Sequence, residues 1–572
     1  MTVLDSRRLT GPGLLLDGPG AVLDVQVDEA ERDRAIAAWR SAMERMLEAV
    51  GWTGARLAVR TFPGGVSLAL GAEPDVLYAA TEVNDWAWAA GRAAVAGSPL
   101  LDFEQAAERL RESIAAERNP RLLALRDAAR RHGVRFLSDD EWVSVGSGSG
   151  VRVWPTTALP ASEEVEWSEV HDIPVALVTG SNGKTTVVRL LSAMVEAAGR
   201  VPGYTSTDGV ALSGVIFAPT DFSGPSGARM LLRRQEVETA VLETARGGIL
   251  RRGLAVERAQ VAVVTNVAAD HLGEFGVQDL RELAETKLLV AGAVVPGGRV
   301  VLNADDPVLV AAAAKLTVPI AWFTLDPASP TVAAHLAAGG TAVLATLEEI
   351  VIAAGSDRTS VVPLAEVALA MGGAARHNVA NALAAVGAAT GLGLPVEAMR
   401  SALRRFGREP GDNPGRANLL DVGGVKILID YAHNPHGMAA LARVTNQLTA
   451  RRRLLLLGQA GDRSDNDIRE LARAAMAIRP DRVVVKEIDQ YLRGRAPGEV
   501  PALIASELER LGIPGEAISQ PGAEVPAVRE ALAWARRGDL LIFALHQDRA
   551  PVLALLDSAR AQGWSAGEAL PV

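Results

Sequence analysis

The sequence predicts an α/β protein of three domains: a small α+β domain, then two larger domains on mostly parallel sheets. Three observations carry this prediction. The chain has 572 residues, too many for one hydrophobic core. From residue 174 onward, short apolar runs alternate with helical segments, which is typical of crossover units on a parallel sheet. The Gly-, Pro- and Asp-rich segment FGREPGDNPGR, residues 406–416, divides this alternation into two series.

The expected elements lead to three domain ranges. In residues 1–170 we expect a helix at 29–50, strands at 56–61 and 66–70, a largely helical stretch at 103–131, and a turn or linker at 145–150. In residues 171–407 we expect strands at 175–179, 239–243, 261–265 and 299–303 and helices at 184–198 and 280–293. In residues 408–572 we expect strands at 426–430, 453–457, 482–486 and 539–543.

Composition excludes several classes of function. The chain has no cysteine, which excludes disulfides, thiolate nucleophiles and cysteine-based zinc sites. The formal net charge is −10 and there is no basic tract, so nucleic-acid binding is not expected as the main role. The N-terminus lacks a signal-peptide layout, and no uncharged apolar run approaches a membrane span. We expect a cytoplasmic homo-oligomer that acts on small molecules and has neither nucleic acid nor membrane as a partner.

The strongest functional signal is VALVTGSNGKTTVVRLL, residues 175–191. An apolar strand runs into a glycine-rich turn and then directly into a helix, so backbone N–H groups and the helix N-terminus face an anion. In this arrangement Lys184 reaches the outer phosphates of a nucleotide, and Thr185 presents its hydroxyl to Mg²⁺. Val178 occupies the place of the usual first glycine, which leaves the shorter GxxGKTT form. The residues expected to bind ATP here are Gly180, Ser181, Asn182, Gly183, Lys184, Thr185 and Thr186.

Two more polar groups follow apolar strands of the same series. Glu243 closes the strand at 239–243, and Asp270 and His271 follow the strand at 261–265. The carboxyl ends of parallel strands meet at one edge of a sheet, so these groups are expected to converge on the phosphates. A strand-end glutamate is ordinarily solvated, but two such groups beside a phosphate loop favour a metal site. Mg²⁺ prefers oxygen ligands, whereas Mn²⁺ accepts imidazole more readily.

Lysine is rare in this chain. Of 58 basic residues only five are lysine, at positions 184, 287, 315, 426 and 486. Lysine that is retained in an arginine-rich chain indicates chemistry that arginine cannot supply. Chance retention is the alternative, and we favour it for Lys315.

The short phosphate loop and the segments after it resemble the Mur ligases and folylpolyglutamate synthetases. The segments, in the family's order, are VLETARGGILRRGL (241–254), VVTNVAADHLGEFG (263–276), LNADDP (302–307), ARHNVANALAAVGAA (375–389) and IDYAHNPHG (429–437). The resemblance implies a central P-loop Mur-ligase ATPase domain and a C-terminal Rossmann-like Mur-ligase domain. It also implies an enzyme: an ATP-dependent, ADP-forming carboxylate–amine ligase.

The resemblance further implies roles for individual residues. Glu243 and His271 would hold a second Mg²⁺ that bridges the γ-phosphate and the acceptor carboxylate. Lys287 stands where many Mur-type ligases have a carbamoylated lysine, which arginine cannot replace. The implied metal ligands are thus Thr185, Glu243, His271 and Lys287. The implied catalytic residues are Lys184, Glu243, His271, Lys287 and Arg416.

Other expected nucleotide contacts come from the later segments. His377 or Asn378 is expected to contact adenine, although Asn378 and Asn381 at a helix start can equally be caps. Arg416 would clamp the γ-phosphate as charge develops. Asp430 and His433 would orient that arginine or the nucleotide.

Within the superfamily, the sequence resembles the Mur-like portion of cyanophycin synthetases. Four segments carry this resemblance: GYTSTDGV (203–210), ETARGGILR (243–251), GDRSDNDIRELARAA (461–475) and KEIDQYLRGRAPGEV (486–500). In that family the Mur-like half joins arginine to an aspartate side-chain carboxylate. The residues before the phosphate loop leave no room for the family's ATP-grasp domain, so we do not expect two-residue polymerisation by this chain alone. The N-terminal domain is expected to bind substrate or to mediate assembly.

Three functional hypotheses result. The favoured one is a ligase that joins an amino acid or amine, such as arginine, to a carboxylate of a peptide-like or amino-acid acceptor through an acyl-phosphate. The second is a Mur-type or folylpolyglutamate-type ligase with an unrelated acceptor. The third is a non-catalytic ATP-binding scaffold. A simple NTPase is a further alternative, but it would not explain the HNVANAL and DYAHNP segments. Candidates for an amine pocket, which can equally be surface charges, are Asp462, Arg463, Asp465 and Arg493.

Overall fold

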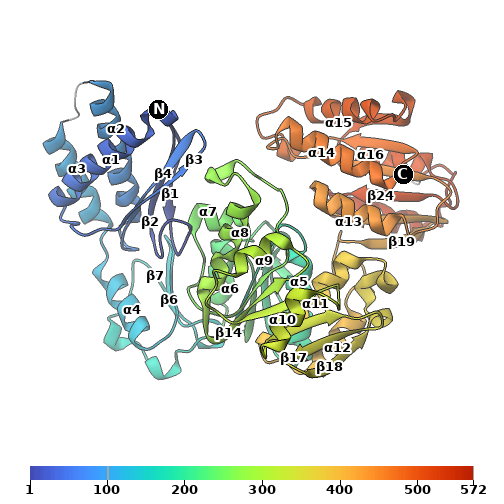
Figure 1. Ribbon diagram of the computed structural model, residues 1–572, viewed down its shortest axis with the longest axis horizontal. Coiled ribbons are helices and arrows are strands. Elements are labelled where there is room, and N and C mark those ends of the chain that lie inside the picture. Colours follow the sequence, from blue (N-terminus) through green and yellow to red (C-terminus); the bar gives the residue numbers. More distant parts are fainter. Residues whose placement is uncertain (99–101, 571–572) are drawn as a thin grey trace.

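Three domains, each with its own sheet, make up the computed structural model, which describes residues 1–98 and 102–570 (Figure 1). The N-terminal domain (blue) and the C-terminal domain (orange to red) both contact the central domain (green to yellow), as Figure 1 shows. No helix within the described ranges is long and apolar enough to cross a membrane. The predicted three-domain α/β class is confirmed.

The N-terminal domain is an antiparallel sheet of order β1-β2-β4-β3, covered by helices. Its elements are β1 (Thr2–Leu9), β2 (Gly20–Gln26), α1 (Glu29–Ala49), β3 (Leu57–Phe62), β4 (Gly65–Gly71), α2 (Leu77–Ala96) and α3 (Phe103–Glu117). Trp39, Leu68 and Trp88 belong to the apolar cluster between the sheet and the helices. The predicted helix at 29–50 and the predicted strand pair are confirmed.

A small subdomain follows the N-terminal sheet. It comprises α4 (Pro120–Arg131), β5 (Phe136–Ser138), β6 (Trp142–Val145) and β7 (Arg152–Pro155). The helical stretch predicted at 103–131 is two helices, because Pro120 begins a new helix. The Gly/Ser segment at 145–150 is a turn between β6 and β7 rather than a linker between domains.

The central domain contains an eleven-stranded sheet of order β11-β10-β9-β12-β8-β13-β14-β15-β16-β17-β18. The strands from β9 to β16 in this order run parallel, and an antiparallel hairpin closes each edge. Their bounds are β8 (Val175–Thr179), β9 (Pro202–Ser206), β10 (Gly209–Leu212), β11 (Val215–Ala218), β12 (Thr239–Glu243), β13 (Ala259–Val264), β14 (Val294–Asn303), β15 (Ile320–Thr324), β16 (Thr341–Ala345), β17 (Glu349–Ala354) and β18 (Asp357–Pro363).

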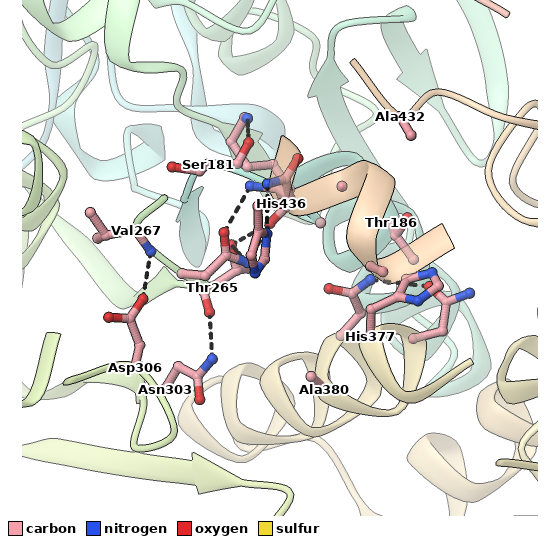
Figure 2. A pocket seen from close by; sticks show the side chains of 18 of the residues that line it. Ser181, Thr186, Thr265, Val267, Asn303, Asp306, His377, Ala380, Ala432 and His436 are labelled. Atoms are coloured by element: carbon pink, nitrogen blue, oxygen red, sulfur yellow. Dashed lines mark hydrogen bonds between the residues drawn. The ribbon is translucent and has the colours of Figure 1, made fainter. Parts of the chain in front are cut away.

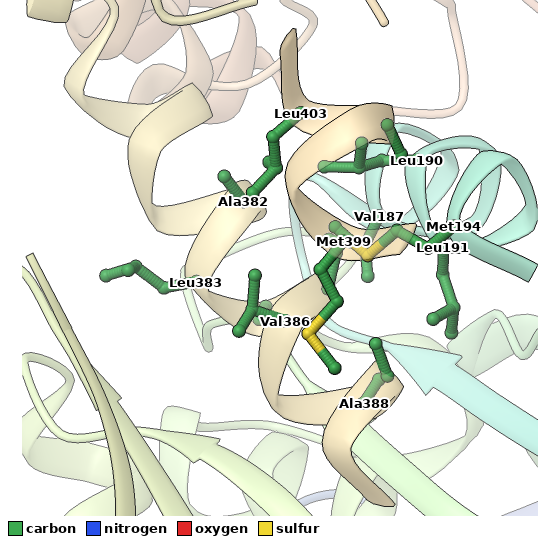
Figure 3. Close-up of a cluster of buried hydrophobic side chains, with 14 of the residues drawn as sticks. Val187, Leu190, Leu191, Met194, Ala382, Leu383, Val386, Ala388, Met399 and Leu403 are labelled. Carbon is green, nitrogen blue, oxygen red and sulfur yellow. The ribbon is translucent and has the colours of Figure 1, made fainter. Parts of the chain in front are cut away.

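Helices cover both faces of this sheet. One face carries α5 (Lys184–Ala197), α11 (Arg376–Gly391) and α12 (Val396–Arg405). The other carries α6 (Pro225–Leu232), α7 (Arg246–Arg252), α8 (Leu280–Leu288), α9 (Pro307–Ala313) and α10 (Pro330–Ala337). Figure 3 shows Val187, Leu190 and Met194 of α5 packed against α11 and α12. Each fully buried side chain of this kind stabilises the fold by about 1.5–3 kcal/mol, so the N-terminus of α5 is held firmly where β8 ends.

The C-terminal domain is a six-stranded sheet of order β19-β20-β24-β21-β22-β23, parallel except for β19. Its strands are β19 (Asn418–Val422), β20 (Val425–Asp430), β21 (Arg453–Leu457), β22 (Arg482–Lys486), β23 (Ile518–Gly522) and β24 (Leu540–Ala544). Its helices are α13 (Pro435–Thr445), α14 (Asp465–Ala475), α15 (Glu499–Arg510), α16 (Glu524–Trp534) and α17 (Arg549–Ala561). All four predicted strands are present, while the exact domain limits stay predictions.

A buried ion pair joins two elements of the C-terminal domain. Lys486 ends β22 and Glu524 begins α16, and their side chains are 0% and 1% exposed. Glu524 also accepts the backbone N–H groups of His546 at 2.9 Å and Gln547 at 3.2 Å, which anchors the loop after β24. The glutamate therefore depends on one cation for charge compensation.

We expect Lys486→Met to lower the free energy of unfolding of this domain by about 3–5 kcal/mol, because it leaves an uncompensated buried carboxylate. Urea denaturation followed by circular dichroism measures the change. Lys426→Met, on the exposed side of β20, is the matched control and should change stability by no more than about 0.5 kcal/mol. Equal stability of the two variants would contradict a stabilising role for the Lys486–Glu524 ion pair.

Candidate active site

A cavity of about 720 Å³ lies where the central and C-terminal domains meet (Figure 2). The predicted site residues that line it are Ser181, Asn182, Gly183, Lys184, Thr185, Thr186, Glu243, His377, Asn378, Asn381, Arg416, Asp430 and His433. Gly180, His271 and Lys287 are not among its lining residues. Most of the predicted set is therefore brought together from both domains.

The phosphate loop presents the start of α5 to this cavity. No side chain caps the helix, so the N–H groups of its first turn lack intrahelical partners. Gly180 and Gly183 have φ values of 145° and 87°. A Cβ on Gly180 would lie 1.9 Å from Thr265 Oγ1, and one on Gly183 would lie 2.2 Å from Asn381 Oδ1. Glycine is required at both positions by conformation and by space.

Neighbouring loops hold the phosphate loop in place. Asn266 Oδ1 accepts the N–H of Asn182 at 3.0 Å, and its backbone oxygen accepts the N–H of Ser181 at 2.9 Å. Thr265 Oγ1 donates to the carbonyl of Asn182 at 2.6 Å. The N–H groups of Ser181 and Asn182 therefore already have acceptors within the protein. The N–H groups in the first turn of α5 remain available to an anion. The sequence did not single out Asn266, although its place directly after an apolar strand was a usable signal.

Glu243 is a buried carboxylate without an ion pair. Its side chain ends β12, is 2% exposed, and forms no salt bridge within the part of the chain that the structure describes. Thr185 Oγ1 donates to Glu243 Oε2 at 2.8 Å, and Thr207 Oγ1 donates to Oε1 at 3.0 Å. Burying an uncompensated charge is costly. Because carboxylate and hydroxyl oxygens are Mg²⁺ ligands, this group fits a hard cation.

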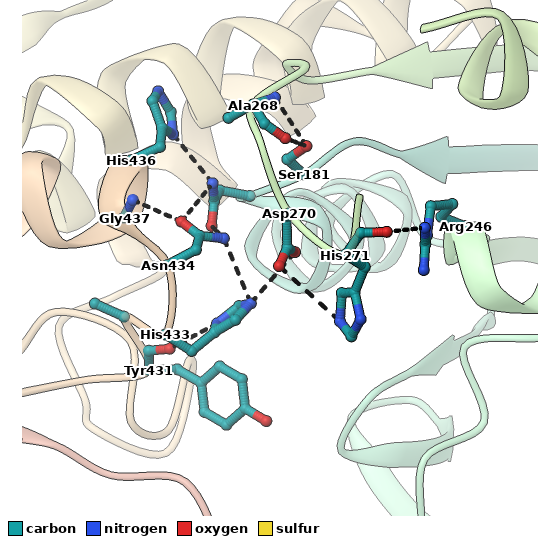
Figure 4. A network of polar contacts seen from close by, with 12 residues as sticks. Ser181, Arg246, Ala268, Asp270, His271, Tyr431, His433, Asn434, His436 and Gly437 are labelled. Carbon is teal, nitrogen blue, oxygen red and sulfur yellow. Dashed lines mark hydrogen bonds and ion pairs between the residues drawn. The ribbon is translucent and has the colours of Figure 1, made fainter. Parts of the chain in front are cut away.

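Asp270 lies at the contact between the central and C-terminal domains, which we call the seam (Figure 4). Its Oδ2 is 3.7 Å from His433 Nε2, and its Oδ1 accepts from Arg463 Nη2 at 3.3 Å. Burial alone would raise the pKa of Asp270, but the hydrogen bond and charge of His433, with His271 and Arg463, hold that pKa far below its usual range. Asp270 is therefore ionised when the domains are in contact.

His271 has a left-handed backbone, with φ of 54°. Its Nδ1 is 2.7 Å from Glu274 Oε1, and its Nε2 is 2.6 Å from Arg463 Nη2. Arg463 Nη1 also lies 2.7 Å from His271 Nδ1, so the guanidinium contacts both ring nitrogens. No hydrogen bond or ion pair links His271 to Glu243 in the described ranges. Figure 4 shows His271 and His433 on either side of Asp270.

Lys287 is a buried amine on α8, 3% exposed. It has no hydrogen-bond or ion-pair partner among the described residues. Burial lowers the pKa of Lys287 well below its usual value, and the nearby charge of Lys184 lowers it further. This shift favours the neutral amine, which is the form that reacts with carbon dioxide.

Helix α11 lines the opposite part of the cavity (Figure 2). Asn378 donates to the carbonyl of Leu369 at 3.1 Å and accepts from Asn381 at 3.1 Å. These two amides thus support the helix and the phosphate loop. His377 forms no hydrogen bond to any described residue, and burial lowers its pKa.

The C-terminal domain contributes Arg416 and a pair of amides. Asp430 accepts the N–H of Ala417 at 2.8 Å, which fixes the turn that carries Arg416. The Arg416 guanidinium lies 4.8 Å from the ring centre of Tyr431. Across the seam, the side chains of Asn182 and Asn434 exchange hydrogen bonds of 3.1 and 3.3 Å.

Of the four amine-pocket candidates, Arg463 lies on the seam, and its side chain is 9% exposed. Asp462 pairs with Arg463 at 3.3 Å. Asp465 forms partly exposed pairs with Arg469 and Arg495. Of the predicted amine-pocket residues, Arg463 and its partner Asp462 therefore lie near the site, whereas Asp465 lies in surface ion pairs.

Comparisons with known proteins agree with this geometry. Residues 178–389 match the Mur ligase middle domain, and residues 415–544 match the family described as Mur ligase, glutamate ligase domain. Cyanophycin synthetase of Synechocystis sp. is 40% identical over 407 residues, which are 70% of this chain and 46% of that protein. UDP-N-acetylmuramoyl-L-alanyl-D-glutamate–2,6-diaminopimelate ligase of Gloeobacter violaceus is 27% identical over 66% of this chain and 74% of that one.

A solved structure of E. coli FolC in complex with ADP, without folate substrate, is 19% identical, covers 68% of this chain and 90% of that chain, and has a TM-score of 0.49. The chain spans less than half the length of the cyanophycin synthetases it matches. The two family matches together take in more than half of the chain and include the phosphate loop, Glu243 and Asp430. This chain belongs to the Mur ligase superfamily.

Proposed function

We propose that this protein is an ATP-dependent, ADP-forming ligase that joins an amine to a carboxylate through an acyl-phosphate. The observation that carries the proposal is the buried, unpaired carboxylate of Glu243, bonded to Thr185 beside the uncapped start of α5. A phosphate cradle next to a buried carboxylate and a hydroxyl that could ligate Mg²⁺ is what phosphoryl transfer from a nucleotide requires.

ATP would bind with its phosphates at the first turn of α5. The side chain of Lys184, which folds back onto the carbonyls of Gly180 and Ser181 at 3.1 and 3.3 Å, would turn to the β- and γ-phosphates. His377 is the better candidate for the adenine contact, because Asn378 already uses its amide within the protein. Arg416, with a buried Nε that lacks a partner in the described structure, would neutralise charge on the γ-phosphate.

Thr185 would hold one Mg²⁺, and Glu243 and His271, with Lys287, would hold a second. Bound there, the ions would supply charge neutralisation for the γ-phosphate and the attacking carboxylate. A carbamate on Lys287 would turn this buried amine into an anion near the cation Lys184. Mn²⁺ would suit the imidazole of His271 better than Mg²⁺ does.

The reaction would proceed in two displacements. A carboxylate oxygen of the acceptor attacks the γ-phosphorus and ADP leaves; the amine then attacks the acyl carbon, loses a proton and expels phosphate. No nucleophile from the protein is needed, so catalysis rests on positioning and charge. Contacts across the seam would exclude water from the acyl-phosphate: the amide pair Asn182–Asn434 and the pair Asp208–Arg549 at 2.6 Å.

The resemblance to cyanophycin synthetases makes arginine the first amine to test and an Asp-containing peptide the first acceptor. Purified protein with Mg-ATP is assayed for ADP release against arginine, lysine and ornithine, each with Asp- or Glu-containing acceptors. ADP that forms only when amine and carboxylate are both present supports the ligase. Release that is indifferent to both indicates an NTPase. Tight ATP binding without turnover indicates either a non-catalytic scaffold or an acceptor outside the tested panel. Analysis of the products formed in cell extract distinguishes these two cases.

Lys287→Met is expected to reduce acceptor-dependent ADP release at least about a hundredfold, because it removes the amine that forms the carbamate ligand. The fold should be kept, since the buried amine forms no hydrogen bond or ion pair with any described residue and methionine fills a similar volume. Wild-type activity should fall in buffer freed of carbon dioxide and return with bicarbonate. A fully active methionine variant, or no response to bicarbonate, counts against carbamoylation.

A further inference from the structure

The loop between β13 and α8 holds two non-glycine residues in left-handed backbone conformations. His271 and Phe275 have φ of 54° and 51°, and Gly273 and Gly276 have φ of 93° and 71°. Left-handed backbone is unfavourable for residues with a Cβ and persists only where the surroundings enforce it. This loop also carries Asp270, so its shape decides where two site residues lie.

The N-terminal sheet holds the second half of this loop, whereas Arg246 of α7 donates to the carbonyl of His271 in the first half. Arg60 on β3 donates from Nη2 to the carbonyl of Gly276 at 2.9 Å and from Nη1 to that of Phe275 at 3.5 Å. The same guanidinium pairs with Glu282 of α8 at 2.9 Å, and both side chains are 18% exposed. A Cβ on Gly276 would lie 2.6 Å from the ring of Phe62, so the sheet touches the loop backbone directly.

A second set of contacts fixes Phe275 and α7 against the same sheet. Two guanidinium groups lie near the Phe275 ring. That of Arg7, on β1, is 5.0 Å from the ring centre, and that of Arg251, on α7, is 5.5 Å from it. Arg7 in turn pairs with Asp24 at 2.6 Å and donates to the carbonyl of Leu250 at 3.0 Å. Figure 1 shows α7 and α8 beside the N-terminal sheet.

We propose that the N-terminal sheet braces the loop of Asp270 and His271, with Arg60 as the positioning residue. This inference rests on the proposed ligase function for its catalytic meaning, but the brace itself is a structural claim. It gives the N-terminal domain a role other than the substrate binding or assembly that the sequence led us to expect. Arg60 reaches the site through the carbonyls of Phe275 and Gly276 and touches no expected substrate.

The first test is amide hydrogen exchange of the full chain without nucleotide. In Arg60→Ala, peptides that cover residues 268–280 should exchange at least about tenfold faster, the effect of losing a charge-assisted hydrogen bond. Peptides from β8 and α5 should keep their rates. Arg56→Ala is the control: Arg56 precedes β3, and its one ion pair among the described residues is with the exposed Asp17. Unchanged loop exchange, or equal acceleration across the whole N-terminal domain, overturns the brace.

The second test is the metal dependence of ADP release. Arg60→Ala should raise the Mg²⁺ concentration needed for half-maximal rate severalfold and leave the KM for ATP unchanged, and Arg60→Lys should recover part of the effect. An effect on stability alone, with no change in metal requirement, overturns the positioning role. If the wild-type protein turns over no ATP with any substrate pair, the proposed function fails, while the exchange experiment still decides whether the brace exists.

Discussion

Replacing Lys184 with alanine is expected to lower ATP turnover by about a thousandfold, because one positive charge on the transferring phosphate is lost. The lysine sits at the first position of α5 and lines the cavity, and among the described residues its amine donates hydrogen bonds to carbonyl oxygens of its own loop and forms no ion pair. Its removal breaks no ion pair, so stability should change little.

The measurement is the initial rate of ADP release at saturating Mg-ATP, with the thermal midpoint as a check on folding. Lys315→Ala is the matched control, since Lys315 is 71% exposed and pairs with Glu285 on the surface. The control should keep full activity. Loss of activity in both variants, or in neither, would remove the phosphate role from Lys184.

Replacing Glu243 with glutamine is expected to have opposite effects on stability and activity. Without metal, the free energy of unfolding should rise by about 1–2 kcal/mol, because a buried uncompensated charge becomes a neutral amide of the same shape. Both threonine hydroxyls can still bond to the amide. Metal-dependent ADP release should fall by about a thousandfold, because the carboxylate ligand is gone.

Thermal unfolding with and without Mg²⁺ separates these effects. The wild-type protein should gain stability on adding Mg²⁺ and nucleotide, and Glu243→Gln should gain much less. Glu236→Gln is the control. Glu236 precedes the same strand, β12, its side chain is 53% exposed, and the variant should behave like wild type. A destabilised Glu243→Gln that keeps its response to Mg²⁺ would contradict the metal role.

Local sequence signals predicted the centre of the fold well. Strands β8 and β12 were predicted with their observed bounds because central parallel strands are continuous apolar runs. The edge strands β11 and β19 were missed, and so were the interior strands β9, β15 and β16, because runs of only four or five residues give too little periodicity to identify a strand. Helix α2 was also missed: it is buried against both α1 and the sheet, so it has no clear polar face.

The site shows the same division between local and long-range information. The contact of Thr185 with Glu243 follows from two neighbouring parallel strands, and the sequence indicated both residues. The contact of Arg463 with His271 and the pair of Asn182 with Asn434 depend on how two separate sheets are placed. No periodicity in the sequence encodes that placement. The brace by Arg60 was missed for the same reason, because 215 residues separate it from Phe275.

The most direct test of the central claim, that this chain phosphorylates a carboxylate, is an oxygen-transfer experiment. An acceptor labelled with ¹⁸O in its carboxylate is incubated with protein, Mg-ATP and the amine, and the released phosphate is analysed by mass spectrometry. The account predicts that one ¹⁸O atom passes from the acceptor to phosphate for each amide formed. Unlabelled phosphate, or release of AMP and pyrophosphate in place of ADP, would contradict it.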